Sequence, residues 1–165
     1  MTNHGSAAGF CCADHSGAAN AQAILAQAEA QARARGLRLT PVRRRTLEIL
    51  LEAHGALGAY EVLELLAREG FGTQPPVAYR ALNFLVENGL AHRIRRLNAF
   101  TACAHPSEEH SAAFLICAGC DSVTEAPARG VSDALAAAAE AAGFALERAT
   151  IEAVGLCRIC QEASA

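Results

Sequence analysis

Two pairs of cysteines, each separated by two residues, have the spacing that most clearly suits metal chemistry. Cys117 and Cys120 enclose an alanine and a glycine, and Cys157 and Cys160 lie close to the end of the chain. A two-residue gap lets both thiolates of a pair face one ion, and two such pairs complete the tetrahedral four-cysteine site that holds structural zinc. Because four protein ligands leave no position for water, we expect this site to stabilise the fold and to have no catalytic role.

A redox role is the alternative for these cysteines. A thioredoxin-like pair would account for only one of the two motifs, and a redox switch built on all four would require zinc to leave on oxidation. The first thirty residues contain no basic segment followed by an apolar run, which argues against a signal peptide. We therefore expect a cytoplasmic protein, in a reducing compartment where paired cysteines are more often metal ligands than disulfides.

Two other classes of protein are disfavoured by what the sequence lacks. No apolar run approaches the roughly 18 residues of a membrane helix. The zinc-enzyme motifs H-E-x-x-H and H-x-E are absent. We expect neither a membrane protein nor an enzyme with a small-molecule substrate.

Arginine is concentrated in one part of the chain, although the net charge is only −3. Residues 33–96 contain eleven arginines and six acidic residues, a balance of +5. The remaining residues contain three arginines and eleven acidic residues, a balance of −8. Such an asymmetry indicates contact with nucleic acid by the basic part.

A helix predicted over residues 75–88 lies within this basic segment. Two prolines suit its first turn, and a glycine follows its end. Its alanine- and leucine-rich face is expected to join the core. The opposite face carries three hydrogen-bonding side chains: Tyr79, Arg80 and Asn83. A solvated face of ordinary charge is the plain alternative, but these side chains offer the base-edge and phosphate contacts of a major-groove helix.

The elements around this helix are typical of a winged helix. Residues 1–19 form a predicted disordered tail, followed by helices over 20–35, 40–53 and 59–67. Residues 90–103 alternate around an arginine-rich bend, which suits a β-hairpin. On either side of the DNA-facing helix, six arginines are expected to contact phosphates: Arg43, Arg44 and Arg45 near a helix start, and Arg93, Arg95 and Arg96 on the hairpin.

The second half of the chain predicts a smaller unit of mixed structure. Strands are expected over 112–116 and 122–125, an alanine-rich helix over 129–142, and a strand over 144–154. The fold class is therefore α+β, with an N-terminal winged-helix DNA-binding domain over 20–104. A C-terminal α/β domain over 105–165 carries the four-cysteine zinc site.

Five segments resemble the ferric uptake regulator (Fur) family of metal-dependent transcriptional regulators. They are Leu39-Thr-Pro-Val-Arg-Arg44, Ala59-Tyr-Glu61, Pro76-Val-Ala-Tyr-Arg-Ala-Leu82, Phe114-Leu-Ile-Cys-Ala-Gly-Cys120 and the final Cys157-x-x-Cys160. The resemblance covers about residues 21–161. Within the family, the chain is most similar to the zinc uptake regulators. The segments that carry this closer likeness are Ala91-His-Arg93, Cys103, Gly143-Phe-Ala-Leu146 and Ile151-Glu-Ala153.

The resemblance implies a dimeric repressor that binds a palindromic DNA operator when loaded with zinc, and that represses zinc-uptake genes. It makes residues 105–165 the dimerisation domain, and it places Tyr79 and Arg80 at DNA-reading positions. In one departure, Val77 and Ala78 stand where the family usually has threonine or serine followed by valine. A hydroxyl contact at the helix start is then missing. A sibling regulator that senses iron, manganese or peroxide would keep this fold and bind a different metal.

A second metal set is implied by the same resemblance. Its members match the regulatory zinc ligands position by position: His92, Cys103, His110 and Glu125. A thiolate favours zinc over manganese or iron(II), although any one such residue in a polar loop is usually only solvated. We expect two zinc ions per subunit, one structural and one regulatory, the latter fixing the two domains relative to each other. Other possible ligands are His105, as a substitute for His110, and the tail residues His4, Cys11, Cys12 and His15.

Overall fold

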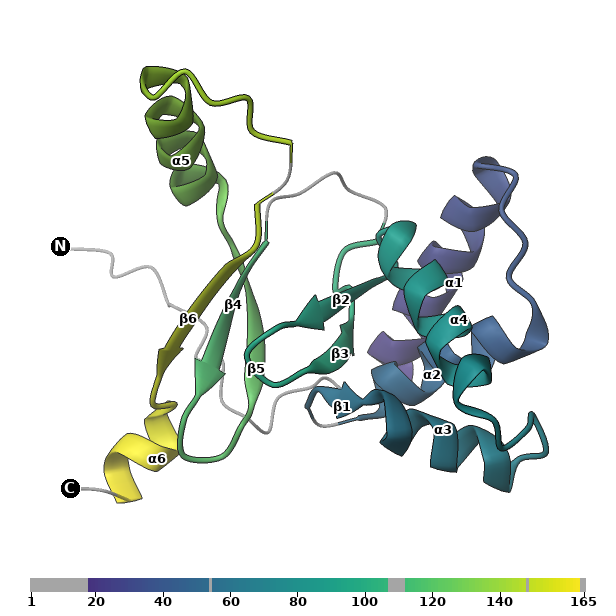
Figure 1. Cartoon of the computed structure of the whole chain (residues 1–165). Coiled ribbons are helices and arrows are strands. Elements are labelled where there is room, and N and C mark those ends of the chain that lie inside the picture. The colour runs from purple at the N-terminus through teal and green to yellow at the C-terminus, as the bar shows by residue number, and fades with distance from the viewer. Residues whose placement is uncertain (1–17, 54, 107–111, 148, 164–165) are drawn as a thin grey trace, which may run out of the picture.

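The computed structural model describes residues 18–53, 55–106, 112–147 and 149–163. Its elements form a helical half and a smaller half built on a sheet (Figure 1). In chain order they are α1 (Ala18–Ala34), α2 (Pro41–Glu52), β1 (Leu57–Gly58), α3 (Ala59–Arg68), α4 (Pro75–Glu87), β2 (Ala91–Ile94), β3 (Ala99–Ala102), β4 (Ala112–Cys117), β5 (Val123–Pro127), α5 (Arg129–Ala141), β6 (Ile151–Gly155) and α6 (Arg158–Ala163). No helix among these residues has the length and apolar character needed to cross a membrane.

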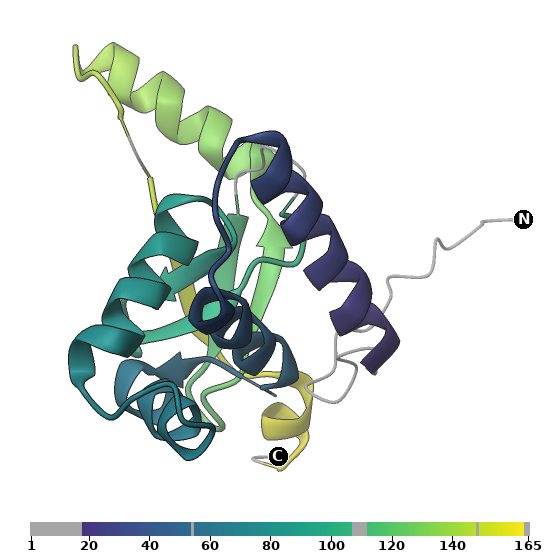
Figure 2. The ribbon, with the colours of Figure 1, turned by 90° about the vertical axis from the view of Figure 1, so that its right-hand side faces the viewer.

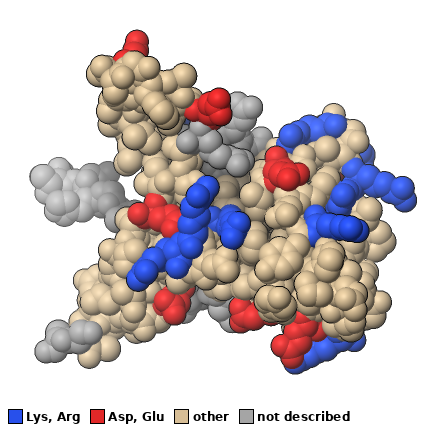
Figure 3. Space-filling model, in the orientation of Figure 1, with Lys and Arg blue, Asp and Glu red and all other residues tan. Residues whose placement is uncertain are grey.

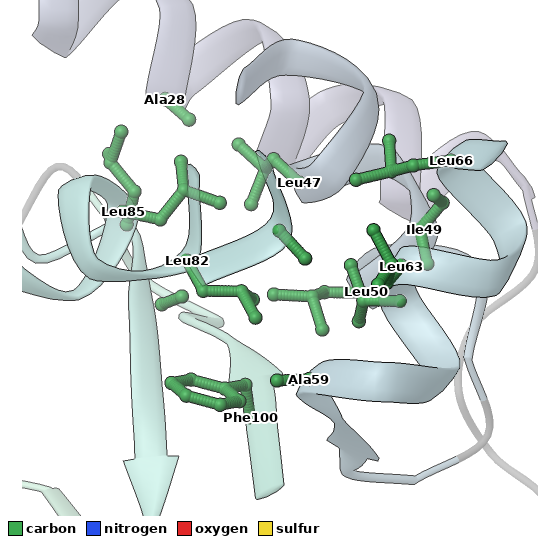
Figure 4. Packing of buried hydrophobic residues seen from close by; sticks show 14 residues of the cluster. Ala28, Leu47, Ile49, Leu50, Ala59, Leu63, Leu66, Leu82, Leu85 and Phe100 are labelled. Carbon is green, nitrogen blue, oxygen red and sulfur yellow. The ribbon is translucent and has the colours of Figure 1, made fainter. Parts of the chain in front are cut away.

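Helices α2, α3 and α4 pack around the main hydrophobic core (Figure 4). Proline begins both α2 and α4, where the missing backbone N–H costs no hydrogen bond. Helix α3 begins with the Gly58 backbone N–H donating to Glu61 Oε2 at 2.7 Å. Because the apolar residues recur every three or four positions, they fall on one face of each helix. The central side chains of this core include Leu47, Val62, Leu66, Leu82 and Leu85.

A three-stranded antiparallel sheet, with the order β1-β3-β2, completes the helical half. Strands β2 and β3 form a hairpin in which Ile94 pairs with Ala99 next to the turn. Asn98 adopts a positive φ of 48° in that turn, a conformation that asparagine tolerates better than most residues. Three helices followed by this hairpin confirm the winged-helix prediction, and β2–β3 is its wing.

The second half contains a sheet with the order β5-β4-β6. Strand β4 pairs antiparallel with β5 and parallel with β6. A parallel pair needs a crossover, and α5 supplies it between β5 and β6. In Figure 1, α5 stands away from the sheet, and none of its residues is buried. The α+β fold class is confirmed.

The strand predicted over 144–154 is shorter than expected, because it begins only at Ile151. The first β6 residue pairs with Ala113, the second residue of β4, so the preceding residues extend past the end of their neighbour. No strand of the described residues lies beside them. For residues 144–150, the prediction of a strand from alternating apolar side chains was therefore wrong. One of these side chains, Phe144, is 66% exposed. The helix α6 and the short strand β1 were not predicted.

The wing packs on the second sheet. Ile94 of β2 and Leu97 of the turn join a small apolar cluster with Phe114, Ile116 and Val123 of strands β4 and β5. This contact places the sheet behind the helices when the molecule is viewed from the helical side (Figure 2). The two halves therefore meet through the wing, where the predicted hinge metal set is also located.

Candidate metal centres and nucleic-acid surface

The four paired cysteines lie at one end of the second sheet. Cys117 is the last residue of β4 and pairs with Gly155, the last residue of β6, so the chain after each strand carries its cysteines to the same place. The four sulfur atoms all lie within 4.8 Å of one another. Cys120 Sγ and Cys157 Sγ are 3.9 Å apart. That separation agrees with a zinc tetrahedron, in which Zn–S bonds of about 2.3 Å place sulfurs about 3.8 Å apart.

The turn after β4 is shaped to bring the first cysteine pair onto the second. Asp121 has a positive φ of 55°, and its backbone N–H donates to the Cys117 carbonyl at 2.9 Å. A Cβ added at Gly119 would lie 3.0 Å from Cys160 Sγ. The absence of a side chain at this position therefore permits the close approach of the two pairs.

Backbone amides surround the Cys117 sulfur. The Cys157 and Gly119 N–H groups each donate to it at 3.3 Å. The Cys157 hydrogen bond is the largest cause that lowers the pKa of Cys117 to about 6. Hydrogen bonding with Cys157 raises the pKa of Cys160 to about 12. The cluster thus favours one thiolate even without an ion, and thiolates are the form that binds metal.

Three of the four predicted hinge ligands also lie together. His92 of β2, Cys103 just after β3 and Glu125 of β5 have donor atoms within 4.8 Å of one another. The first two belong to the winged-helix half and the third to the second sheet. The fourth, His110, lies outside the described residues, as do His4, Cys11, Cys12 and His15. His105 is exposed and is not part of this group of three.

Packing holds these three side chains in place. The His92 ring lies 5.0 Å from the Phe114 ring, centroid to centroid, and its Nε2 is 3.8 Å from Glu125 Oε2. The Ala104 backbone N–H donates to the same carboxylate oxygen at 3.1 Å. Burial, and then the negative charge of Glu125, raise the pKa of Cys103 to about 12. A Cys103 thiolate beside the Glu125 carboxylate is costly unless a cation compensates the two charges, so an imidazole, a thiolate and a carboxylate together fit a zinc-type ion.

Helix α4 exposes the expected hydrogen-bonding face. Tyr79, Arg80 and Asn83 are all exposed, while the opposite face is buried in the core. Among the described residues, Arg80 has no ion-pair partner, so its guanidinium is available to a ligand. Tyr60, at the start of α3, packs edge-to-face on Tyr79 with ring centroids 6.4 Å apart. Sequence reasoning did not assign Tyr60 to this surface, although its position outside the apolar stripe of its helix was a usable clue.

The arginines of α2 are held by contacts within the protein. The Arg43 guanidinium lies 3.6 Å above the centre of the Phe84 ring and donates to the Arg38 carbonyl. Arg44 pairs with Glu29 of α1 and with Glu48 one turn later. Phosphate contacts by Arg43 and Arg44, which we expected, would have to compete with these partners.

The wing carries exposed positive charge. Arg95 and Arg96 are both exposed at its turn. In Figure 3, basic side chains gather over the wing and over the outer side of the helical half. Exposed positive charge is thus present on the wing, at Arg95 and Arg96, and on α4, at Arg80.

Comparison with known proteins identifies the family. The model of the family described as "Ferric uptake regulator family" matches residues 34–154. The chain belongs to the ferric uptake regulator family. It is 40% identical over 145 residues to a zinc uptake regulation protein of Escherichia coli K12, covering 87% of this chain and 85% of that protein.

Solved structures of Fur-family members agree with this assignment. A zinc uptake regulator complexed with zinc and DNA superposes with a TM-score of 0.83 at 39% identity, covering 87% of this chain and 97% of the other. Holo XcZur superposes with a TM-score of 0.78 at 42% identity, covering 87% and 99%. Apo XcZur, at 41% identity and the same coverage, gives only 0.50. The chain is thus more similar in overall shape to holo XcZur than to apo XcZur.

Proposed function

We propose that this Fur-family chain is a zinc-responsive transcriptional repressor, which binds palindromic operator DNA as a zinc-loaded homodimer and represses zinc-uptake genes in the cytoplasm. One observation carries the proposal. His92 and Cys103 of the winged-helix half lie within 4.8 Å of Glu125 of the second sheet, measured between donor atoms. An ion bound at this junction would hold the DNA-binding surface in one orientation.

The proposed domains meet at this junction. Residues 20–104 form the winged-helix domain with its hinge, residues 105–165 form the dimerisation domain, and residues 1–19 precede them. Support comes from the separate sheets, since β1-β3-β2 and β5-β4-β6 share no strand. The two halves contact each other through the wing and its small apolar cluster.

We assign two zinc ions to each subunit. The four-cysteine set, Cys117, Cys120, Cys157 and Cys160, would hold the structural ion. His92, Cys103 and Glu125 would hold the regulatory ion, with His110 as the fourth ligand. Bound zinc would supply a fixed tetrahedral junction. The thiolate in the regulatory set favours zinc over iron(II) and manganese, which are the metals of the sibling regulators.

Within the chain, these residues would act by selecting one arrangement of the two domains. The better superposition on holo XcZur than on apo XcZur supports this mechanism. Moving a two-state hinge from 1:99 to 99:1 requires about 5.5 kcal/mol of differential binding. An ion with ligands from both domains would bind one arrangement more tightly than the others, because separating the domains removes at least one ligand from the ion.

We propose that a second copy of the chain packs against α5 in a homodimer. This helix has no buried residue, and its apolar side chains face solvent, with Val131 54% and Leu135 40% exposed. A 13-residue helix is marginal in water without packing. A homodimer formed there would place two α4 helices one DNA turn, or a multiple of it, apart.

On DNA, α4 would occupy the major groove. Tyr79, Arg80 and Asn83 would face base edges, with Tyr60 beside them. The wing residue Arg95 would contact phosphate. Arg43 and Arg44 would do so only by leaving their present partners.

Operator binding across buffered free zinc, iron(II) and manganese tests this function. The probe is a labelled DNA duplex that the zinc-loaded full chain selects from a random library, and the readout is fluorescence anisotropy. We expect tight binding with zinc, and at least a ten-fold loss of zinc-stimulated affinity in Cys103→Ser, because a hydroxyl is a poor zinc ligand.

The outcomes separate the alternatives. A response to iron(II) or manganese and not to zinc would make the protein a sibling sensor. Indifference to every metal would exclude a metal-dependent repressor, and an unchanged response of Cys103→Ser would overturn the sensor assignment.

A further inference from the structure

A carboxylate of the second sheet reaches the turn of the wing. The two oxygens of Glu152, on β6, accept hydrogen bonds from consecutive backbone amides: Oε1 from the Arg95 N–H at 2.7 Å and Oε2 from the Arg96 N–H at 3.0 Å. The residues are 56 and 57 positions apart in sequence. This contact is separate from both metal sets.

We propose that Glu152 is a positioning residue, which latches the wing onto the second sheet without itself being a metal ligand and so orients Arg95 and Arg96 toward DNA. The role toward DNA rests on the proposed function. The latch itself is a property of the fold and can be measured without DNA.

The amides of the wing turn are suited to such a latch. Pairing between β2 and β3 ends at Ile94 and Ala99, so the Arg95 and Arg96 amides lie outside the ladder. Consecutive N–H groups in a turn form a concave anion site, and hydrogen bonds to a carboxylate are stronger than those between neutral groups. Glu152 thus holds the backbone of two residues whose side chains are exposed, Arg95 and Arg96.

The latch and the metal set hold opposite ends of one strand. His92 lies near the start of β2, beside Glu125, and the latched amides follow its end. Phe114 links the two: its ring contacts His92, and it pairs with Glu152 in the sheet. Both contacts favour the same packing of the wing on the sheet. If the Glu152 contact is lost, a higher free zinc concentration is therefore needed to stabilise that packing through the metal set.

Electrostatics alone predicts the opposite effect. Removing a carboxylate from beside two arginines leaves the wing more positive, which by itself strengthens DNA binding. The latch predicts weaker binding, so the sign of the change decides between the explanations. The test variant is Glu152→Gln, and the control is Glu147→Gln, which removes the same charge from an exposed position in the same half.

Amide hydrogen exchange in the zinc-loaded full chain, without DNA, tests the latch directly. We expect exchange at Arg95 and Arg96 to accelerate about ten-fold or more in Glu152→Gln, as for loss of hydrogen bonds to a charged group. It should be unchanged in Glu147→Gln. The core amide of Leu82 must keep its protection in both variants, which shows that they are folded. Equal exchange of the wing amides in wild type and Glu152→Gln would overturn the latch.

Operator binding tests its consequence, with the DNA duplex that the wild-type protein selects from a random library. In Glu152→Gln, the free zinc that gives half-maximal binding should rise about ten-fold. At saturating zinc, the slope of log affinity against log salt should become shallower by about one to two, since each lost phosphate contact removes about 0.9. General destabilisation would not change that slope.

Two results would overturn this role. One is tighter binding by Glu152→Gln, as for a pure charge effect, and the other is a salt slope equal to that of Glu147→Gln. If the wild-type protein selects no duplex, the proposed function fails, while hydrogen exchange still decides the latch.

Discussion

At the scale of single residues, the four-cysteine site depends on a position that carries no ligand. Gly119 lies between two cysteines, and the space where its Cβ would be is next to the sulfur and Cβ of Cys160, at 3.0 and 3.1 Å. Any side chain there would push the two pairs apart. Glycine is required here by close approach, since its backbone adopts no positive φ.

Gly119→Ala should weaken metal binding at this site about ten-fold, in line with the usual cost of overpacking. Competition with a chromophoric zinc chelator measures the effect. Gly155→Ala is the matched control, because Gly155 ends β6 near the same cysteine cluster and a Cβ there meets nothing within 4 Å. Equal affinities for the two variants would contradict the steric explanation.

At the scale of elements, an ion-pair cluster joins α2 to the end of α3. Arg45 donates to Glu52 at 2.9 Å on its own helix and to Glu69, just after α3, at 2.6 and 2.7 Å. The pKa of Arg45 is raised, first by the hydrogen bond with Glu69. The same bond lowers the pKa of Glu69. Arg45, which we also expected to contact phosphate, is held by these carboxylates and supports the arrangement of the helices that carry the DNA-facing surface.

Arg45→Ala should destabilise the protein by about 1 kcal/mol, as for hydrogen bonds to charged groups that remain partly solvated. Arg68→Ala is the control, since Arg68 is 68% exposed and pairs only within its own helix. Urea unfolding measures both. Because the pKa of Glu69 is depressed, its contribution is present above pH 4.5 and is lost as the pH falls below it. The two variants should thus converge at low pH, and a difference that persists there would contradict the ion-pair explanation.

At the scale of the whole molecule, several apolar side chains are exposed on elements that no other part of the described chain buries. Helix α5 and the segment after it expose Val131, Leu135, Phe144 and Leu146. Strand β6 is an edge strand, and its Val154 is 53% exposed. Contiguous exposed apolar residues mark an association surface, and the proposed homodimer covers it.

Leu135→Lys should raise the dimer dissociation constant at least about 100-fold, because it places an unpaired charge in the buried interface. Sedimentation equilibrium of the zinc-loaded chain measures this change. Ala26→Lys, at an exposed position of α1, is the control and should leave the dimer intact. A Leu135→Lys protein that sediments like the wild type would place the interface elsewhere.

Local patterns in the sequence were sufficient for the features that depend on neighbouring residues. The Cys-x-x-Cys spacings, the prolines that begin α2 and α4, and the apolar periodicity of the helices each act within a few positions, so the winged helix and the cysteine cluster could be predicted. Only the tertiary structure decided which distant groups meet. It placed Tyr60 on Tyr79 and paired Arg44 with Glu29. The family resemblance had implied that Glu125 meets His92 and Cys103, which no local spacing indicates.

Contacts between distant residues also explain the other points at which the structure differs from the prediction. Residues 144–150 alternate as a strand does, but a strand forms only beside a neighbouring strand. The parallel neighbour β4 begins only at Ala112, and its pairing with β6 begins at Ala113 and Ile151. Glu152 looks like an ordinary polar residue of a strand until the wing turn lies against it. The cysteine pairs are evident from their spacing alone, whereas the contact of Glu152 with the wing turn arises only when residues more than 50 positions apart are packed together.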